Sequence, residues 1–232
     1  MIIVIIPVYN HEEALHRSLD SLQIQTVTDF QAIVVDDGSS PAIRLQTSDY
    51  NFPIQFVRQN NASAPAARNN GFSLSKGEYV IFWDADLIAE PDMLEKMLNA
   101  LQKHPEASFA YSNFTFGKKK MPARTFDVQS LQKRNYIHTS SLIRRKDVIA
   151  WDESLKKFQD WDYFLTLAEQ GKTGVWIDEY LFDIETGGTM SEWLPRFAYF
   201  MPFKWLPGIS RKVKKYEGAK YIIQAKHHLL ND

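Results

Sequence analysis

The sequence predicts an α/β fold in which a mainly parallel central sheet is flanked by helices. Segments of strand and helix character alternate over the first hundred residues, an order that favours right-handed βαβ units. The segments at 2–6 and 79–82 are continuous apolar runs, which is typical of strands buried on both faces. The chain has 232 residues, 44% of them hydrophobic, and this suits one globular domain with a sizeable core.

The N-terminal elements are predicted from apolar runs and from the polar residues that flank them. Residues 2–6 form a β-branched run that predicts the first strand. Asn10, followed by Glu13 three residues later, predicts a capped helix start. Further strands are expected at 30–35, 54–57 and 79–82, and helices at 64–74 and after Pro91.

The second half of the chain is less regular, and its elements are predicted from shorter patterns. We expect strands at 109–116, 140–144 and 175–177, an exposed turn at Lys118-Lys119-Lys120, and a helix that starts near Asp160 and ends before Gly171.

Residues 193–232 differ from the rest in composition. Aromatic residues crowd together with prolines, and a basic cluster follows at 211–215. Two interpretations stay open. The segment is either an extension that packs its aromatic side chains on the core, or a peripheral membrane contact in which aromatic and basic side chains meet lipid headgroups.

Charge and composition exclude several classes of protein. The net charge is −1 and the isoelectric point about 6.6, which argues against a nucleic-acid-binding protein. There is no cysteine, so disulfides and thiolate metal sites are excluded. No apolar run approaches the roughly 20 residues that cross a bilayer, and the N-terminal run lacks the length and the basic flank of a signal peptide. We therefore expect a cytoplasmic protein, with attachment at the inner face of a membrane as the open alternative.

Two acidic residues follow the fourth predicted strand. Asp84 and Asp86 are spaced i, i+2, so on an extended segment their side chains point the same way. They lie at the C-terminal end of the strand, where ligands bind in open α/β sheets. Converging carboxylates repel each other unless a cation or buried donors offset the charge, and Mg²⁺ and Mn²⁺ prefer oxygen ligands. The pair indicates either a divalent-metal site or a solvated loop, and the spacing alone does not decide between them.

Polar residues at the other strand ends favour the metal-site interpretation. Loops that follow parallel strands share one edge of the sheet, and a nucleotide diphosphate fits such an edge. There, Asp37 can accept a hydrogen bond from a base, and Arg68 can donate to the base or to the diphosphate. Taken singly, each residue also suits ordinary turn or surface chemistry. The glycine motif of dinucleotide-binding folds is absent, because residues 7–12 contain no glycine.

Several motifs, in their order along the chain, resemble those of family 2 glycosyltransferases. They cover roughly residues 1–191 and lie at 6–10 (Ile-Pro-Val-Tyr-Asn), 35–39 (Val-Asp-Asp-Gly-Ser), 67–71 (Ala-Arg-Asn-Asn-Gly), 84–86 (Asp-Ala-Asp), 139–145, 151–155 and 159–162 (Gln-Asp-Trp-Asp). The resemblance implies an inverting, metal-dependent enzyme with a nucleotide-sugar-binding domain of the GT-A fold. We expect this catalytic domain at 1–192, with a nucleotide-binding half at 1–104 and an acceptor-side half at 105–192, and a helical and aromatic extension at 193–232.

By position, the resemblance also implies a role for each site residue. The residues that would bind the donor are Pro7, Tyr9, Asp37, Arg68, Asp84 and Asp86, the last holding Mn²⁺ or Mg²⁺. Asp160 would be the catalytic base, and Trp161 and Asp162 would shape the acceptor side. Independently, a helix N-terminus favours the ionised, proton-accepting form of Asp160, although the same position suits an ordinary N-cap.

Two positions leave alternatives open. Thr186 stands where the family often has a metal-ligating histidine, and Glu185 is the alternative ligand one residue away. His138 either meets the acceptor or satisfies local backbone groups.

The expected function is transfer of a sugar, from a UDP-sugar by the resemblance, to a hydroxyl of a growing glycan or a lipid-linked acceptor. A nucleotide-sugar-binding protein, or a subunit that needs a partner for transferase activity, remains the alternative.

Overall fold

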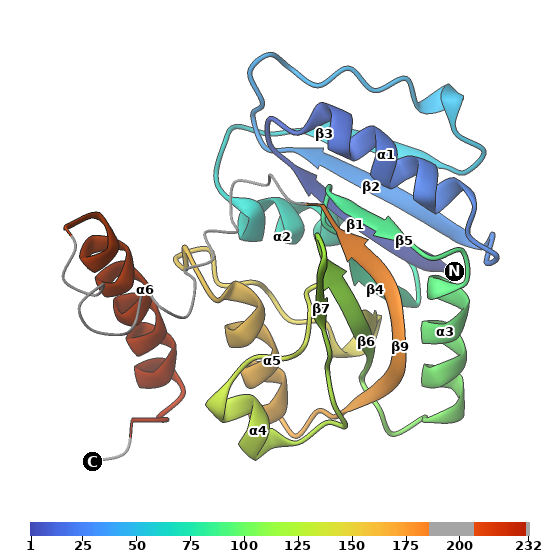
Figure 1. Cartoon of the computed structure of the whole chain (residues 1–232). Coiled ribbons are helices and arrows are strands. Elements are labelled where there is room, and N and C mark those ends of the chain that lie inside the picture. Colours follow the sequence, from blue (N-terminus) through green and yellow to red (C-terminus); the bar gives the residue numbers. More distant parts are fainter. Residues whose placement is uncertain (186–206, 231–232) are drawn as a thin grey trace.

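The computed structural model describes residues 1–185 and 207–230, which form a curled mixed sheet flanked by helices (Figure 1). The strand order is β3-β2-β1-β4-β8-β6-β9-β5, and β7 pairs with β6. The strands are β1 (Ile2–Val8), β2 (Phe30–Asp36), β3 (Ile54–Arg58), β4 (Tyr79–Phe82), β5 (Leu87–Ala89), β6 (Phe109–Phe116), β7 (Lys119–Met121), β8 (Leu142–Arg144) and β9 (Gly174–Ile184). The helices are α1 (Glu12–Gln23), α2 (Ala64–Leu74), α3 (Met93–Lys103), α4 (Val128–Lys133), α5 (Gln159–Glu169) and α6 (Pro207–Lys226).

The parallel part of the sheet is the N-terminal part. β1 pairs in parallel with both β2 and β4, and β2 pairs in parallel with β3. Beyond β4 the sheet is mixed, since β8 is antiparallel to both of its neighbours and β9 is parallel to β6 but antiparallel to β5. The predicted βαβ order is therefore observed for β1 to β4, and their C-terminal ends meet at one edge of the sheet.

Both faces of the central parallel strands β1 and β4 are buried, which explains their unbroken apolar sequences. In β1, Ile2, Val4 and Ile6 belong to the core under α1 and α3, whereas Ile3 and Ile5 belong to the core under α2 and α5. Adjacent side chains of a strand point to opposite faces, so a strand between two helical layers needs an apolar residue at every position.

Gly71 permits the close packing of α2 on the sheet. A Cβ atom at this position would lie 2.5 Å from Cγ2 of Ile5 and 3.2 Å from Cγ2 of Val35. Both side chains are fully buried in the centre of the sheet, so neither can move aside. The glycine within this helix is therefore required by packing.

Replacement of Gly71 by alanine is expected to destabilise the protein by about 1–3 kcal/mol, the usual cost of an overpacked core. The measurement is urea unfolding followed by circular dichroism. Gly218→Ala in α6 is the matched control, because nothing lies within 4 Å of its added Cβ, and alanine favours a helix. An unchanged free energy of unfolding for Gly71→Ala would contradict this account.

Two local predictions were wrong. The N-cap of α1 is His11 and makes no side-chain cap bond. Asn10 instead has a φ of 55°, and its side chain accepts from the backbone of Ser40 at 2.8 Å, which ties the β1 loop to the β2 loop. The lysine run is not wholly a turn, since Lys119 and Lys120 pair with β6 as part of β7.

The helix α6 packs beside α5 at the side of the molecule (Figure 1). Its own side chains Val213 and Ile223 are buried. Lys226 at its end and the next residue, His227, form ion pairs with Asp162, both at 2.8 Å. The helical part of the predicted extension is thus observed, whereas its aromatic part and the predicted boundary at 192 lie outside the described residues. Within residues 1–185 and 207–230, no helix combines the length and apolar character required to cross a membrane.

Candidate active site

A cavity of about 1490 Å³ opens at the edge where the parallel strands end. Its walls come from the ends of β1 and β2, from α2, from the turn after β4, from the hairpin of β6 and β7, from α4 and the loop after it, and from the start of α5. Nearly all the site residues predicted from the sequence line it, namely Pro7, Tyr9, Asp37, Arg68, Asp84, Asp86, His138, Asp160 and Trp161. Acids that are far apart in the chain therefore gather in one concave space.

Asp37 is held by the loop that follows β3. Its Oδ1 atom accepts from the side chain of Gln59 at 2.8 Å and from the backbone of Ala62 at 2.9 Å, and its Oδ2 atom accepts from the backbone of Ser63 at 3.0 Å. A carboxylate offers about four lone-pair directions, so one direction on Oδ2 is left for a ligand. Tyr9, which is 41% exposed, lies in the same wall and is not a core residue.

The turn after β2 holds Asp37 in place. Asp36 is fully buried and accepts from the backbone of Ser39 at 2.9 Å and from Arg58 at 3.1 Å, so its role is structural. Gly38 has a φ of +78°, and a Cβ atom there would lie 2.7 Å from the backbone nitrogen of Asn61. Only glycine fits this position.

Asp84 lies between two basic side chains. Arg68 donates to its Oδ1 atom at 2.9 Å, and the guanidinium of Arg68 lies 4.6 Å from the centre of the Trp151 ring. The Nδ1 atom of His138 accepts from the backbone of Ser140 at 3.1 Å, so the ring proton is on Nε2, which faces Oδ2 of Asp84 at 3.6 Å. His138 thus satisfies a local backbone group and faces the carboxylate of Asp84.

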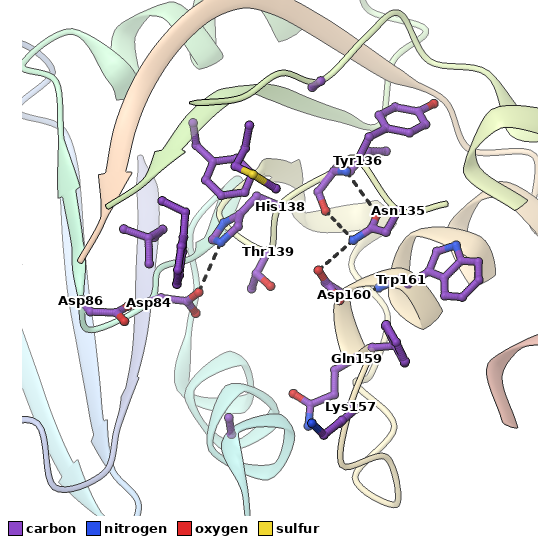
Figure 2. Close-up of a pocket in the computed structure, with 18 of the residues that line it drawn as sticks. Asp84, Asp86, Asn135, Tyr136, His138, Thr139, Lys157, Gln159, Asp160 and Trp161 are labelled. Atoms are coloured by element: carbon purple, nitrogen blue, oxygen red, sulfur yellow. Dashed lines mark hydrogen bonds and ion pairs between the residues drawn. The ribbon is translucent and has the colours of Figure 1, made fainter. Parts of the chain in front are cut away.

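Asp86 carries an uncompensated carboxylate. Burial and then the charge of Asp84 raise its pKa to about 7. The two acids lie in a turn between β4 and β5, so the predicted extended backbone is wrong, yet both line the cavity (Figure 2). No salt bridge reaches Asp86 from any described residue. A bound cation would relieve the repulsion between the carboxylates of Asp84 and Asp86.

The protein contributes few further ligands near Asp86. Glu185 donates its backbone N–H to the carbonyl of Asp86 at 3.0 Å, but its carboxylate is paired with Arg17 at 2.7 Å. Over residues 1–185 and 207–230, no group of three or more histidine, cysteine and acidic side chains is placed to hold a metal ion. Thr186 lies outside the described residues. Mg²⁺ commonly takes one or two carboxylates with substrate phosphates as its remaining ligands, so the oxygen donors present fit such an ion.

Asp160 faces Asp84 and Asp86 across the cavity (Figure 2). It lies in the first turn of α5 and not at the N-cap, which is Phe158 with a φ of 59°. Its Oδ1 atom accepts from the backbone of Trp161 at 2.9 Å, and its Oδ2 atom accepts from the side chain of Asn135 at 2.7 Å. Burial raises the pKa of Asp160, and the nearby charges of His138 and Arg68 oppose that increase.

The two residues after Asp160 have different positions. Trp161 lines the cavity, and the N–H of its buried indole donates to the carbonyl of Leu131 at 2.6 Å, so it also supports α4. Asp162 does not line the cavity, because its carboxylate faces α6 and pairs with Lys226 and His227. Asp162 therefore lies outside the lining of this cavity, and its expected role on the acceptor side stays a prediction.

Asn135 is the site residue that sequence reasoning missed. Its amide donates to Asp160 and to the carbonyl of Ile137, and its Oδ1 atom accepts from the backbone of Ile137 at 3.1 Å. Hydrogen bonds therefore fix both the nitrogen and the oxygen of the Asn135 amide. No motif marks this residue, because the loop that carries it meets α5 only in the folded chain.

The sequence matches a known family and several curated proteins. A family model described as Glycosyl transferase family 2 matches residues 3–151. An uncharacterized glycosyltransferase from Haemophilus influenzae is 27% identical over 185 residues, which cover 73% of this chain and 63% of that protein. Chondroitin synthase from Escherichia coli is 27% identical over 184 residues, which cover 74% of this chain and 27% of the synthase. The chain thus spans less than two thirds of the length of either relative.

Solved structures share the fold at low sequence identity. S. aureus TarS 1-349 in complex with UDP has a TM-score of 0.68 at 18% identity, over 80% of this chain and 60% of that one. Mannosyltransferase PcManGT from Pyrobaculum calidifontis, in complex with GDP-Man and Mn²⁺, has a TM-score of 0.64 at 17% identity, over 81% of this chain and 57% of that one. The predicted GT-A fold class is confirmed by this likeness.

Proposed function

Because this chain belongs to glycosyl transferase family 2, we propose that it is an inverting glycosyltransferase that moves a sugar from a nucleotide diphosphate to an acceptor hydroxyl. The observation that carries the proposal is the single cavity in which Asp37, Asp84 and Asp86 face Asp160. In this proposal, the side of the cavity lined by Asp37, Asp84 and Asp86 is the donor side, and the side lined by Asp160 is the acceptor side. The acceptor is a growing glycan or a glycolipid.

The donor side suits a uridine diphosphate sugar. Asp37 has one acceptor direction left for the base, and Pro7 and Tyr9 lie in the same wall. Arg68 holds Asp84 in place for contact with the ribose or the sugar. The S. aureus protein TarS, which shares the fold, has been crystallised with UDP and with UDP-GlcNAc, and this supports uracil as the base.

Asp86 is the residue that would hold Mn²⁺ or Mg²⁺. Its raised pKa reflects a buried carboxylate beside another acid, an environment that favours a divalent cation. The mannosyltransferase of the same fold is described with Mn²⁺, which supports this choice of ion. When bound, the ion would supply positive charge for the leaving diphosphate.

Asp160 is the general base in this mechanism. One of its carboxylate oxygens takes the proton of the acceptor hydroxyl while the acceptor oxygen bonds to the anomeric carbon and the bond to the diphosphate breaks. A single displacement of this kind inverts the configuration at that carbon. Burial raises the pKa of Asp160, which makes its carboxylate a stronger proton acceptor than that of an exposed aspartate, and the charge of Arg68 opposes that rise.

Incubation with a panel of UDP-sugars and Mn²⁺, with and without candidate acceptor glycans, tests the function. UDP release that rises when an acceptor is added supports the transferase, and analysis of the product linkage by NMR tests inversion. Tight binding of the donor without turnover on any acceptor would support the alternative of a nucleotide-sugar-binding protein.

Asn135→Ala is expected to lower kcat about tenfold at neutral pH, because one hydrogen bond to a charged group is lost. Loss of this donor raises the pKa of Asp160 further, so the ionised base is lost at a higher pH than in the wild type. The measurement is the pH dependence of kcat, whose acid limb should move to higher pH. Asn51→Ala, at an exposed position away from the cavity, is the matched control. A fall in kcat without a shifted acid limb would show that Asn135 has only a structural role.

A further inference from the structure

Charge is sharply divided within the cavity. Three acids, Asp37, Asp84 and Asp86, lie on the donor side, which is built from the first hundred residues. The opposite side carries a group of basic residues that we call the basic wall, formed by Arg124, Lys133, Arg134, Lys156, Lys157 and Lys220. The whole chain has a net charge of only −1, so this concentration of positive charge is local.

The basic wall is assembled from separate parts of the chain. Arg124, Lys133 and Arg134 come from the segment around α4, where residues 118–134 hold six basic residues and one acid, Asp127. That acid caps α4 by accepting from the backbone of Ser130 at 2.7 Å. Lys156 and Lys157 precede α5, and Lys220 reaches the cavity from α6. Folding therefore gathers cations that no single motif brings together.

Partners for these cations are scarce in the protein. Among the described residues, no carboxylate forms a salt bridge with any member of the basic wall. Lys226 at the end of α6 is by contrast paired with Asp152 at 2.7 Å. Unpaired cations that line a concave surface attract anionic ligands and raise their local concentration.

The position of the basic wall indicates which substrate it meets. Asp160 lies in the first turn of α5, directly after the segment that carries Lys156 and Lys157, and Figure 2 shows Lys157 and Gln159 on the same side of the cavity as Asp160. A hydroxyl that gives its proton to Asp160 has to lie on this side, whereas the donor nucleotide lies against the acids. The molecule in contact with the basic wall is thus the acceptor.

We propose that the acceptor carries phosphate groups and that the basic wall binds them beside the hydroxyl that is glycosylated. This inference rests on the proposed function of the cavity. Lysine binds phosphate as a point charge and arginine binds it through paired donors, and six such side chains match several phosphates along a glycan. The wall is concave and shares its cavity with the base, so it suits a phosphate-bearing glycan better than the flat surface of a bilayer.

The test is direct binding of a short, fluorescently labelled glycerol phosphate oligomer in the absence of donor, measured by anisotropy. A neutral malto-oligosaccharide of similar length is the comparison ligand. We expect tight, salt-sensitive binding of the phosphate oligomer and weak binding of the neutral one. The double variant Lys133→Gln/Arg134→Gln should bind the phosphate oligomer about tenfold more weakly. The matched control, Lys76→Gln/Lys103→Gln, removes the same charge from exposed positions outside the cavity and should bind like the wild type.

Three outcomes would overturn the proposal. They are equal binding of both oligomers, equal binding by the wild type and the basic-wall variant, and binding to phosphatidylglycerol vesicles without binding to the soluble oligomer. The last would assign the wall to a membrane surface. UDP binding, measured by calorimetry for each variant, reports on the donor side separately. Absence of any sugar transfer together with specific oligomer binding would count against the proposed function and leave the anion site standing.

Discussion

Asp160→Asn is expected to lower kcat by about a thousandfold, within the range of 10²–10⁴ that general-base catalysis contributes. The amide has nearly the shape of the carboxylate but cannot take a proton from the acceptor hydroxyl. Its oxygen can still accept from the backbone of Trp161, so the start of α5 is preserved. The donor side does not include Asp160, and the Kd of UDP should therefore change less than about twofold.

The measurement is steady-state transfer with a saturating UDP-sugar, together with calorimetry of UDP binding. Asp20→Asn on the exposed face of α1 removes the same charge far from the cavity and should leave transfer unchanged. A variant at position 160 that transfers sugar within a few-fold of the wild-type rate would show that another group accepts the proton.

Asp86→Ala is expected to weaken UDP binding in the presence of Mn²⁺ by about 100-fold, since loss of a metal ligand removes the ion that links the diphosphate to the protein. In the presence of a chelator, the wild type and the variant should bind UDP alike, because only the contacts to the base and the ribose remain. This dependence on the ion separates a ligand from a residue that merely supports the loop.

Calorimetric titrations give the affinity for UDP of the wild type and of Asp86→Ala, each with and without Mn²⁺. The control is Asp49→Ala, an exposed acid in the short turn before β3. If Asp86→Ala retains a wild-type gain in affinity from Mn²⁺, the ion is held by other residues, and the assignment of Asp86 is wrong.

The parallel strands and the acids at their ends could be predicted from the sequence because both depend on local patterns. Residues of β1 are apolar throughout, since helices cover both faces. The short elements could not be found in this way. β5 and β7 have three residues each, too few for a period of two to stand out.

Contacts between distant residues explain the remaining differences. The bond from Asn135 to Asp160 joins positions 25 apart, and that from Lys226 to Asp162 joins positions 64 apart. Neither has a signature in its own segment. Trp161 and Asp162 follow Asp160 directly, yet which of them faces the cavity depends on where α6 packs, and helical spacing alone does not contain that information.

In the proposed function, the hydrogen bonds around Asp37 would limit how the base of the donor can bind. Three protein donors already occupy this carboxylate, so the base has to present an N–H group to the one direction that is left. Uracil, thymine and guanine carry a hydrogen on the ring nitrogen of their pairing edge, whereas the equivalent nitrogen of cytosine and adenine is a hydrogen-bond acceptor. Cytosine and adenine present an N–H only through their exocyclic amino group, so a CDP-sugar or an ADP-sugar would have to place its base differently to donate to Asp37.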